Sequence, residues 1–136
     1  MILADSNIVL DIWDSDPVWA QWSRNQLDIL ALTHELAINP IIYAEIASRY
    51  STQAKLDAAI ARLGFSFLSL PREAAFLASR AFAQYRQSGG TRTAVLPDFF
   101  IGAHAEALGC AVLTRDVSRY RTYFPTVNLI TPDLAL

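Results

Sequence analysis

Four acidic residues stand in separate parts of this sequence, and each lies at the edge of an apolar segment. They are Asp5, Glu45, Asp98 and Asp116. A carboxylate beside a buried segment costs free energy unless it is hydrogen-bonded, paired with a cation or bound to a metal ion. Carboxylate oxygens are the ligands that Mg²⁺ and Mn²⁺ prefer in proteins. The four residues therefore predict a divalent-cation site, provided that the fold brings them together.

A site of this kind could hydrolyse a phosphodiester bond. The reaction needs an activated water molecule and neutralisation of negative charge around the phosphorus, and one or two divalent cations supply both. Several carboxylates can hold the cations while leaving coordination positions for water and phosphate. Without a cation, the same carboxylates would repel one another and raise each other's pKa values.

Each acidic residue also has a purely structural explanation when it is considered alone. Asp5 and Asp98 could cap helices or compensate helix dipoles. Glu45 could pair with Arg49, which lies four positions later. Asp116 could form a turn or a cap that opens the segment 117–120. The catalytic interpretation rests on finding all four in order, at the edges of elements that should pack side by side.

The elements that must position these residues alternate along the chain. Apolar runs predict strands at residues 2–4, 36–39, 65–68, 111–114 and 128–130. Helices are expected at residues 7–13, from 16 to about 31, at 40–50, at 52–63, from 71 to a stop at Gly89-Gly90, and from 97 to about 109. Strands that alternate with helices predict an α/β domain with a mainly parallel sheet.

In such a sheet, ligands bind beyond the carboxyl ends of the strands, at the point where the strand order reverses. Asp5 and Asp116 each follow a strand candidate, and Glu45 and Asp98 lie near expected helix starts. We therefore expect all four side chains to face one crevice.

The composition predicts one cytoplasmic domain spanning residues 1–136. Hydrophobic residues make up 53% of the chain and charged residues 18%, which provides a core and argues against disorder. No apolar run reaches the length of a membrane span, and no basic region precedes the first apolar residues. Cys110 is the only cysteine, so neither an intrachain disulfide nor a cysteine-based zinc site is expected.

Arginine dominates the positive charge. Lys55 is the only lysine, and the other ten basic residues are arginines. A net charge of −2 does not itself indicate nucleic-acid binding. Arg115, Arg119 and Arg121 nevertheless surround one of the four carboxylates, and a guanidinium group can bind phosphate through two hydrogen bonds.

Other catalytic patterns are missing from the sequence. There is no nucleophile elbow, no phosphate-binding glycine loop and no dinucleotide-binding glycine motif. His34 and His104 do not belong to a recognisable triad pattern. His104 follows Asp98 by six positions, which places it on the opposite side of a helix, so we expect a structural role.

Taken together, the segments around the acidic residues resemble the PIN-domain ribonucleases, and in particular the VapC-type toxins of toxin–antitoxin pairs. The resemblance covers essentially the whole chain. Any single segment is unspecific, but the ordered set is specific. The matching segments are residues 3–8, 39–46, 97–105, 113–116, 123–125 and 129–132.

The resemblance implies a three-layer α/β/α domain and a metal-dependent endoribonuclease that uses Mg²⁺ or Mn²⁺ to cleave RNA. It also implies a homodimer and a cognate VapB-type antitoxin. By this resemblance, the catalytic and metal-binding residues are Asp5, Glu45, Asp98 and Asp116. The residues expected to support the site are Ser6, Asn7 and Thr114. The residues expected to contact RNA are Arg92, Arg115, Arg119 and Arg121.

Three alternatives remain open at this point. A haloacid-dehalogenase-like phosphatase also begins with a strand ending in Asp, but it normally carries a second Asp where this chain has Asn7. A PIN nuclease of RNA processing would have no antitoxin. A non-catalytic PIN-like binding module would usually lose one or more of the acidic residues, and a metal titration would distinguish it from a nuclease.

Overall fold

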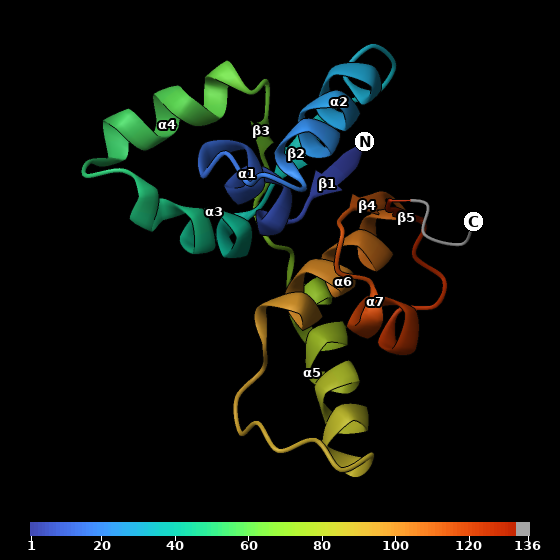
Figure 1. Ribbon diagram of the computed structural model, residues 1–136. Coiled ribbons are helices and arrows are strands. Elements are labelled where there is room, and N and C mark those ends of the chain that lie inside the picture. Colours follow the sequence, from blue (N-terminus) through green and yellow to red (C-terminus); the bar gives the residue numbers. More distant parts are fainter. Residues whose placement is uncertain (133–136) are drawn as a thin grey trace.

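The computed structural model describes residues 1–132, and its strands form one parallel sheet (Figure 1). The strands follow one another across the sheet in the order β3-β2-β1-β4-β5. Their bounds are β1 Ile2–Ala4, β2 Leu36–Ile38, β3 Ser66–Phe67, β4 Ala111–Leu113 and β5 Leu129–Ile130. The parallel α/β sheet predicted from the sequence is confirmed. Its strand order reverses between β1 and β4, because β1 leads to β2 on one side and β4 leads to β5 on the other.

Helices cover both faces of this sheet. Their bounds are α1 Ser6–Trp13, α2 Ala20–Leu30, α3 Pro40–Ile46, α4 Gln53–Arg62, α5 Arg72–Gln87, α6 Pro97–Leu108 and α7 Ser118–Tyr123. Helices α1 to α4 lie on one face and α5 to α7 on the other, which gives three layers, α/β/α (Figure 1). This arrangement is the one expected when right-handed crossovers join parallel strands. The two groups of helices contact each other where α3 meets α6.

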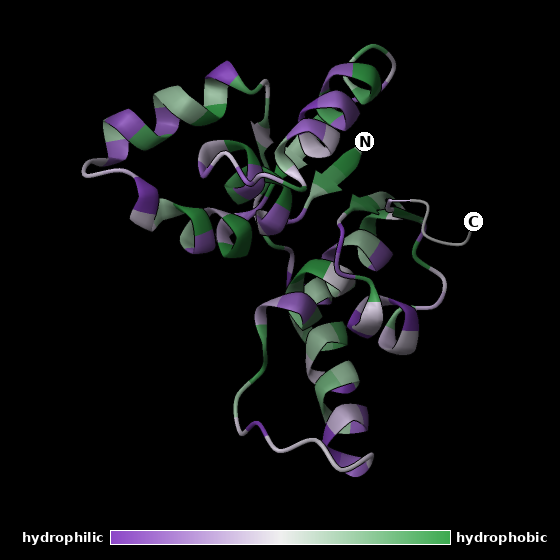
Figure 2. Cartoon of the chain, viewed as in Figure 1, coloured by the Kyte–Doolittle hydropathy of each residue, from purple (hydrophilic) through white to green (hydrophobic). Residues whose placement is uncertain are grey.

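The central strands are buried on both faces. Every residue of β1 and β2 is buried, and Leu3, Ala37, Ile38, Val112 and Leu113 are fully buried. Figure 2 shows these strands in the hydrophobic colour, while the hydrophilic colour is concentrated on the helices. Continuous apolar strands are expected when helices cover both faces of a parallel sheet. This rigid centre fixes the position of the residues that follow each strand.

Several element boundaries differ from the sequence-based predictions. The helix expected from Asp16 begins at Ala20, because the Asp16 carboxylate accepts the backbone N–H groups of Val18 and Trp19, each at 2.8 Å, and so caps a preceding turn. The helix expected over residues 40–50 changes to a 3₁₀ helix at Ala47–Arg49. No helix was predicted after residue 116, but Ser118–Tyr123 form the helix α7.

One helix end was predicted correctly for a clear conformational reason. Helix α6 ends before Gly109, whose backbone has a φ of 67°. This left-handed conformation is unfavourable for residues with a Cβ atom, and glycine is the residue that adopts it readily. In residues 1–132, no helix is long and apolar enough to cross a membrane.

Candidate active site at the carboxyl edge of the sheet

Asp5 lies at the reversal point of the sheet. It follows β1 directly and caps α1, with its Oδ1 atom accepting the backbone N–H of Ser6 at 2.7 Å. Its own N–H donates to the carbonyl of Leu113 at 2.9 Å, which ties it to the end of β4. The residue is only 4% exposed. Asp5 is therefore both the cap of a helix and a buried carboxylate at the edge where ligands bind in such sheets.

Three side chains donate to the other oxygen of Asp5. The Oδ2 atom accepts the hydroxyl of Tyr120 at 2.8 Å, the hydroxyl of Thr114 at 2.9 Å and the Asn7 amide at 3.4 Å. The Asn7 amide also donates to Thr114 Oγ1 at 3.0 Å. The Ser6 hydroxyl reaches Oδ1 at 3.4 Å. The structure thus brings the three predicted supporting residues, Ser6, Asn7 and Thr114, to one carboxylate.

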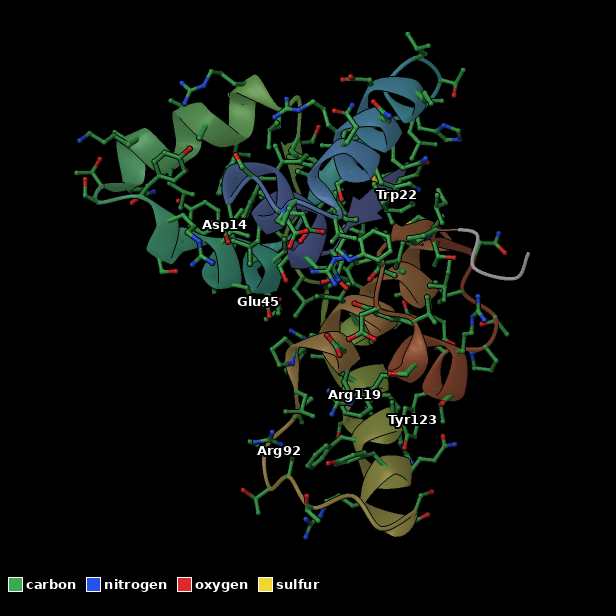
Figure 3. All side chains as sticks on the ribbon, in the orientation of Figure 1. Asp14, Trp22, Glu45, Arg92, Arg119 and Tyr123 are labelled. Carbon is green, nitrogen blue, oxygen red and sulfur yellow. The ribbon has the colours of Figure 1, made fainter. Side chains whose placement is uncertain are left out.

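Glu45 lies on α3 and has a carboxylate oxygen without a partner. Within residues 1–132, its Oε1 atom is buried and accepts no hydrogen bond. The alternative pairing with Arg49 is wrong, because Arg49 forms two hydrogen bonds with Asp14, at 2.8 and 2.9 Å. Figure 3 shows Asp14 and Glu45 as separate labelled side chains. A buried, unpaired carboxylate oxygen is costly, which makes it a good candidate for cation binding.

Asp98 and Asp116 occupy the more open part of the site. Asp98 lies in the first turn of α6, after Pro97, and its Oδ2 atom accepts Arg119 Nη1 at 3.3 Å. Asp116 is exposed, and its backbone N–H donates to Thr114 Oγ1 at 3.1 Å. Thr114 therefore connects the loop after β4 to Asp5.

Burial and mutual repulsion shift the acidity of three of these groups. Burial is the largest cause that raises the pKa values of Asp5, Glu45 and Asp98. The negative charge of Asp98 further raises the pKa of Asp5, and both of these charges raise the pKa of Glu45. Asp116 raises the pKa of Asp98, while Arg119 lowers it. The charges of Asp5 and Asp98 thus lie close enough to influence Glu45, and the charge of Asp116 lies close enough to influence Asp98.

The chemistry of this donor set fits a hard divalent cation. All the side-chain donors are carboxylate oxygens, and one of them, Glu45 Oε1, lacks a partner in the described chain. A cation would also relieve the repulsion that raises the pKa values. In the conformation of residues 1–132, however, no three carboxylate, histidine or cysteine side chains are close enough to hold one metal ion together. Ligation by three or more of the four residues would require side-chain rotation.

Arg115 is engaged beside the site rather than inside it. Its Nε and Nη2 atoms donate to the two carboxylate oxygens of Asp11 at 2.7 and 2.9 Å, and Asp11 is buried. The guanidinium carbon also lies 5.5 Å from the ring centroid of Trp19. This pair joins α1 to the loop after β4, so the Arg115 guanidinium is not free to approach a phosphate without breaking the pair.

The other three arginines differ in their distance from the acidic residues. Arg119, on α7, pairs with Asp98 and lies over the ring of Tyr85, 5.8 Å from its centroid. Arg92 is exposed in the loop before α6, and Arg121 is exposed on α7. Figure 3 shows Arg92 and Arg119 on separate segments. Of the four arginines, Arg119 makes a direct contact with a member of the acidic set.

Two polar residues of the site region were not identified from the sequence. Tyr120 is 1% exposed, and burial followed by the charge of Asp5 raises its pKa well above the usual value, so it remains a donor. Asn39 caps α3 by accepting the N–H of Ile42 at 2.9 Å, and its amide contacts His104 Nδ1 at 3.1 Å. A tyrosine in a short amphipathic helix gives no signal that its hydroxyl reaches a distant carboxylate.

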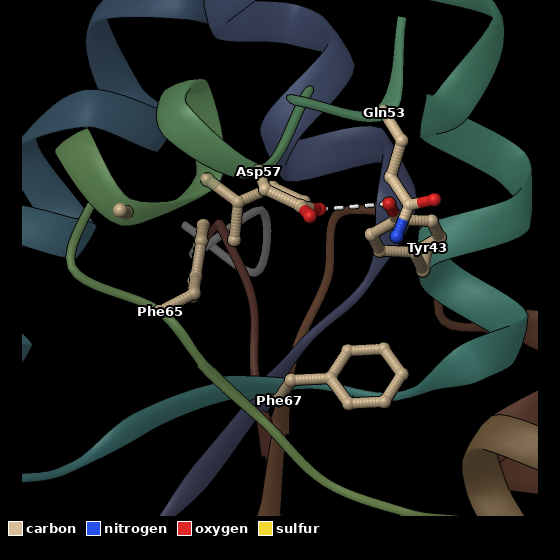
Figure 4. A pocket seen from close by; sticks show the side chains of 7 residues that line it. Tyr43, Gln53, Asp57, Phe65 and Phe67 are labelled. Atoms are coloured by element: carbon tan, nitrogen blue, oxygen red, sulfur yellow. Dashed lines mark hydrogen bonds between the residues drawn. The ribbon is translucent and has the colours of Figure 1, made fainter. Parts of the chain in front are cut away.

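Surface hollows border α3. One, of about 420 Å³, is lined by Tyr43, Asp57, Phe65 and Phe67 among others, and the Tyr43 hydroxyl donates to Asp57 at 2.7 Å inside it (Figure 4). None of the four acidic residues lines it. A second hollow, of about 310 Å³, has Glu45 at its edge and otherwise apolar walls.

Similar folds occur in several solved structures. VapBC2 from Rickettsia felis, bound to a promoter DNA fragment, contains a chain with 19% identity and a TM-score of 0.73, and the match covers 96% of this chain and 98% of that one. FitAcB from Neisseria gonorrhoeae contains a chain with 22% identity and a TM-score of 0.68, and the match covers 97% of this chain and 98% of that one. A toxin–antitoxin complex from Klebsiella pneumoniae contains a chain with 23% identity and a TM-score of 0.66, and the match covers 97% of this chain and 98% of that one.

These likenesses concern the fold, since their sequence identities are low. A search of curated protein sequences found no match. The sequence itself matches a model of the PIN domain over residues 2–125, a span that contains all four acidic residues. The match covers nearly the whole chain, and the chain therefore belongs to the PIN-domain family.

Proposed function

We propose that this chain is a Mg²⁺- or Mn²⁺-dependent endoribonuclease and the toxin of a VapBC-type toxin–antitoxin pair, acting in the cytoplasm. The nuclease proposal is supported by the four carboxylates, of which Asp5 is buried at the reversal point of the sheet. Glu45 gives the strongest support, because its buried Oε1 atom has no hydrogen-bond partner among the described residues. A divalent cation would neutralise the repulsion that raises the pKa values of Asp5, Glu45 and Asp98, and carboxylate oxygens are ligands that such a cation prefers.

Each residue would have a distinct part in the reaction. Asp5, Glu45, Asp98 and Asp116 would hold the cation, which supplies Lewis acidity and lowers the pKa of bound water. Water attacks the phosphorus, the bond to one ester oxygen breaks, and that oxygen leaves with a proton. Ser6, Asn7 and Thr114 keep Asp5 oriented through the hydrogen bonds described above.

Arg119 is the arginine best placed to bind the RNA backbone. It already contacts Asp98 at 3.3 Å, and a phosphate group could take over that contact once a cation satisfies the carboxylate. Arg92 and Arg121 are exposed and could bind more distant phosphates. Arg115 is the weakest of the four proposed RNA contacts, because Asp11 already satisfies its guanidinium group.

The toxin role is supported by the solved structures of similar fold. Those from Rickettsia felis and Klebsiella pneumoniae are a VapBC complex and a toxin–antitoxin complex, respectively. We propose by analogy that this chain forms a homodimer and binds a VapB-type antitoxin. A PIN nuclease of RNA processing, without an antitoxin, is the alternative that the experiments below distinguish.

Cleavage of RNA by the purified protein tests the nuclease proposal. Single-stranded RNA should be cut in the presence of Mg²⁺ or Mn²⁺, and EDTA should stop the reaction. Asp98→Asn keeps the side-chain shape but removes a ligand charge, so it should lower the rate at least about 100-fold. Cleavage that continues in excess chelator, or an Asp98→Asn variant with the wild-type rate, would overturn the metal mechanism. Absence of both cation binding and cleavage would favour a binding module.

Expression in bacteria tests the toxin proposal. The wild-type chain alone should arrest growth, and co-expression of the protein encoded by the adjacent gene should restore it. The Asp98→Asn variant should not arrest growth, although it should still bind that partner in a pull-down. If the wild-type chain is harmless at high expression yet cleaves RNA in vitro, the RNA-processing alternative replaces the toxin role.

A further inference from the structure

Tyr120 donates a hydrogen bond to the most buried carboxylate of the acidic site. Its hydroxyl lies 2.8 Å from Asp5 Oδ2, although the two residues are 115 positions apart in the sequence. Tyr120 is 1% exposed and Asp5 is 4% exposed, so water does not compete for this bond. A hydrogen bond from a neutral donor to a buried carboxylate is stronger than one between two neutral groups.

The donors around Asp5 are divided unequally between its two oxygens. Oδ2 accepts from Tyr120, Thr114 and Asn7, whereas Oδ1 accepts from the backbone and, at 3.4 Å, the hydroxyl of Ser6. A carboxylate oxygen has about two lone-pair directions. Oδ2 accepts two short hydrogen bonds, at 2.8 and 2.9 Å, whereas Oδ1 accepts a single short one, at 2.7 Å. Oδ1 is therefore the oxygen with more acceptor capacity left for a cation.

Helix α7 holds the Tyr120 hydroxyl in place through its packing on α6. The Phe124 ring lies so close to Gly102 that a Cβ atom at that position would be 2.3 Å from a ring carbon. Phe124 is buried, and its N–H donates to the Tyr120 carbonyl at 2.8 Å. The close approach of the two helices thus determines where the hydroxyl reaches Asp5.

We propose that Tyr120 is a positioning residue that sets the cation affinity of the site, by fixing Asp5 Oδ2 so that Oδ1 remains available. This inference rests on the proposed cation-dependent function. In this role Tyr120 would act through Asp5, to which its hydroxyl donates, rather than as a ligand of the cation. Outer partners of metal ligands typically change metal affinity by about 10- to 100-fold when they are removed.

The Tyr120→Phe variant tests this role, because phenylalanine fills the same space and removes only the hydroxyl. Isothermal titration with Mn²⁺ alone, without RNA, should show about tenfold weaker binding than in the wild-type chain. The Mn²⁺ concentration for half-maximal cleavage should rise by the same factor. The maximal rate at saturating Mn²⁺ should remain within about threefold of wild type, since the reacting groups are unchanged.

Tyr123→Phe is the matched control. Tyr123 lies on the same helix and packs against the ring of Phe99, but no hydrogen bond of its hydroxyl is found among residues 1–132. The Tyr123→Phe variant should bind Mn²⁺ with the same affinity as the wild-type chain. If Tyr120→Phe binds Mn²⁺ as the wild type does, even with a lower melting temperature, the positioning role is overturned while the proposed function stands. If the wild-type chain binds no Mn²⁺, both proposals fall.

A measurement on unaltered Tyr120 covers the case in which Tyr120→Phe does not fold. A cation at Asp5 withdraws electron density from the oxygen that accepts the Tyr120 hydroxyl, so Mn²⁺ should shift the near-ultraviolet absorption of one buried tyrosine. The difference spectrum should be the same in the wild-type chain and in Tyr123→Phe. Its absence at saturating Mn²⁺ would overturn the inference.

Discussion

Glu45 has a carboxylate that lies among other negative charges and forms no ion pair with Arg49. Burial raises the pKa of its carboxyl group and the charges of Asp5 and Asp98 raise it further, while the Ser6 side chain lowers it in part. The nearest candidate cation in sequence, Arg49, is held by Asp14 instead. The residue therefore gains little from the fold in the absence of a cation, which is the pattern expected of a group kept for function rather than for stability.

The Glu45→Gln variant should make the cation-free protein more stable at pH 7 and abolish cleavage. A raised pKa means that the folded state holds its proton more tightly than the unfolded chain. The stability from that group is present below the unfolded pKa and is lost as the pH rises through the folded value. Glutamine removes this loss, so the melting temperature in EDTA should rise by about 2 °C or more at pH 7.

The melting temperatures of Glu45→Gln and the wild-type chain in EDTA should not differ near pH 4, where the wild-type Glu45 is itself protonated. Glu73→Gln is a suitable control, because Glu73 is exposed in the first turn of α5. A Glu45→Gln variant that is less stable than the wild-type chain at pH 7 would show that the carboxylate has a partner in solution.

At the scale of elements, α3 is positioned by a polar pair inside the core. Asn39 caps the helix through its Oδ1 atom, and its amide contacts His104 Nδ1 on α6. Burial lowers the pKa of His104, which keeps the ring neutral and able to accept from the amide. The structural role expected for His104 is thus to connect the helices that carry Glu45 and Asp98.

Two substitutions of Asn39 should separate helix capping from this connection. Asn39→Ser keeps an N-cap oxygen but loses the contact with His104, whereas Asn39→Ala loses both. Loss of a cap costs about 1 kcal/mol, and a buried polar group left without a partner costs about 1–3 kcal/mol. Urea denaturation should therefore rank the stabilities as wild type, Asn39→Ser and Asn39→Ala, in descending order. Equal stability of all three proteins would show that the cap and the contact contribute nothing.

At the scale of the whole molecule, the sheet order brings together residues from four separate connections. The reversal between β1 and β4 creates the edge, and contact of α3 with α6 closes it from the two helical layers. In the absence of a cation, repulsion between these carboxylates destabilises the folded state. Cation binding should consequently stabilise the entire domain, because a ligand that binds the folded state alone shifts the unfolding equilibrium.

Excess Mn²⁺ should raise the melting temperature more at pH 7 than at pH 5. The pKa values of Asp5, Glu45 and Asp98 are raised, so protons compete with the cation at the lower pH. Differential scanning fluorimetry with Mn²⁺ or EDTA at both pH values measures the effect, and Asp98→Asn should reduce it. An equal shift at both pH values would mean that Mn²⁺ binds away from these carboxylates.

The sequence by itself determined the class of the fold and the residues proposed to bind the cation. Apolar strands, helix caps and Gly109 are local signals, because they depend on side-chain periodicity and on the backbone conformation of single residues. They were sufficient to predict a parallel α/β sheet with acidic residues at its edge. They failed at Asp16, where the same capping chemistry serves a turn that precedes the helix.

Only the tertiary structure decided which partner each charged side chain takes. Arg115 binds Asp11 across 104 positions of sequence, Arg49 binds Asp14 across 35, and Tyr120 reaches Asp5 across 115. Such pairs depend on how whole helices pack, and the spacing of residues along the chain does not encode that distance. The physical reason is that periodicity places a side chain on a face, whereas a hydrogen bond requires two faces to meet within about 3 Å.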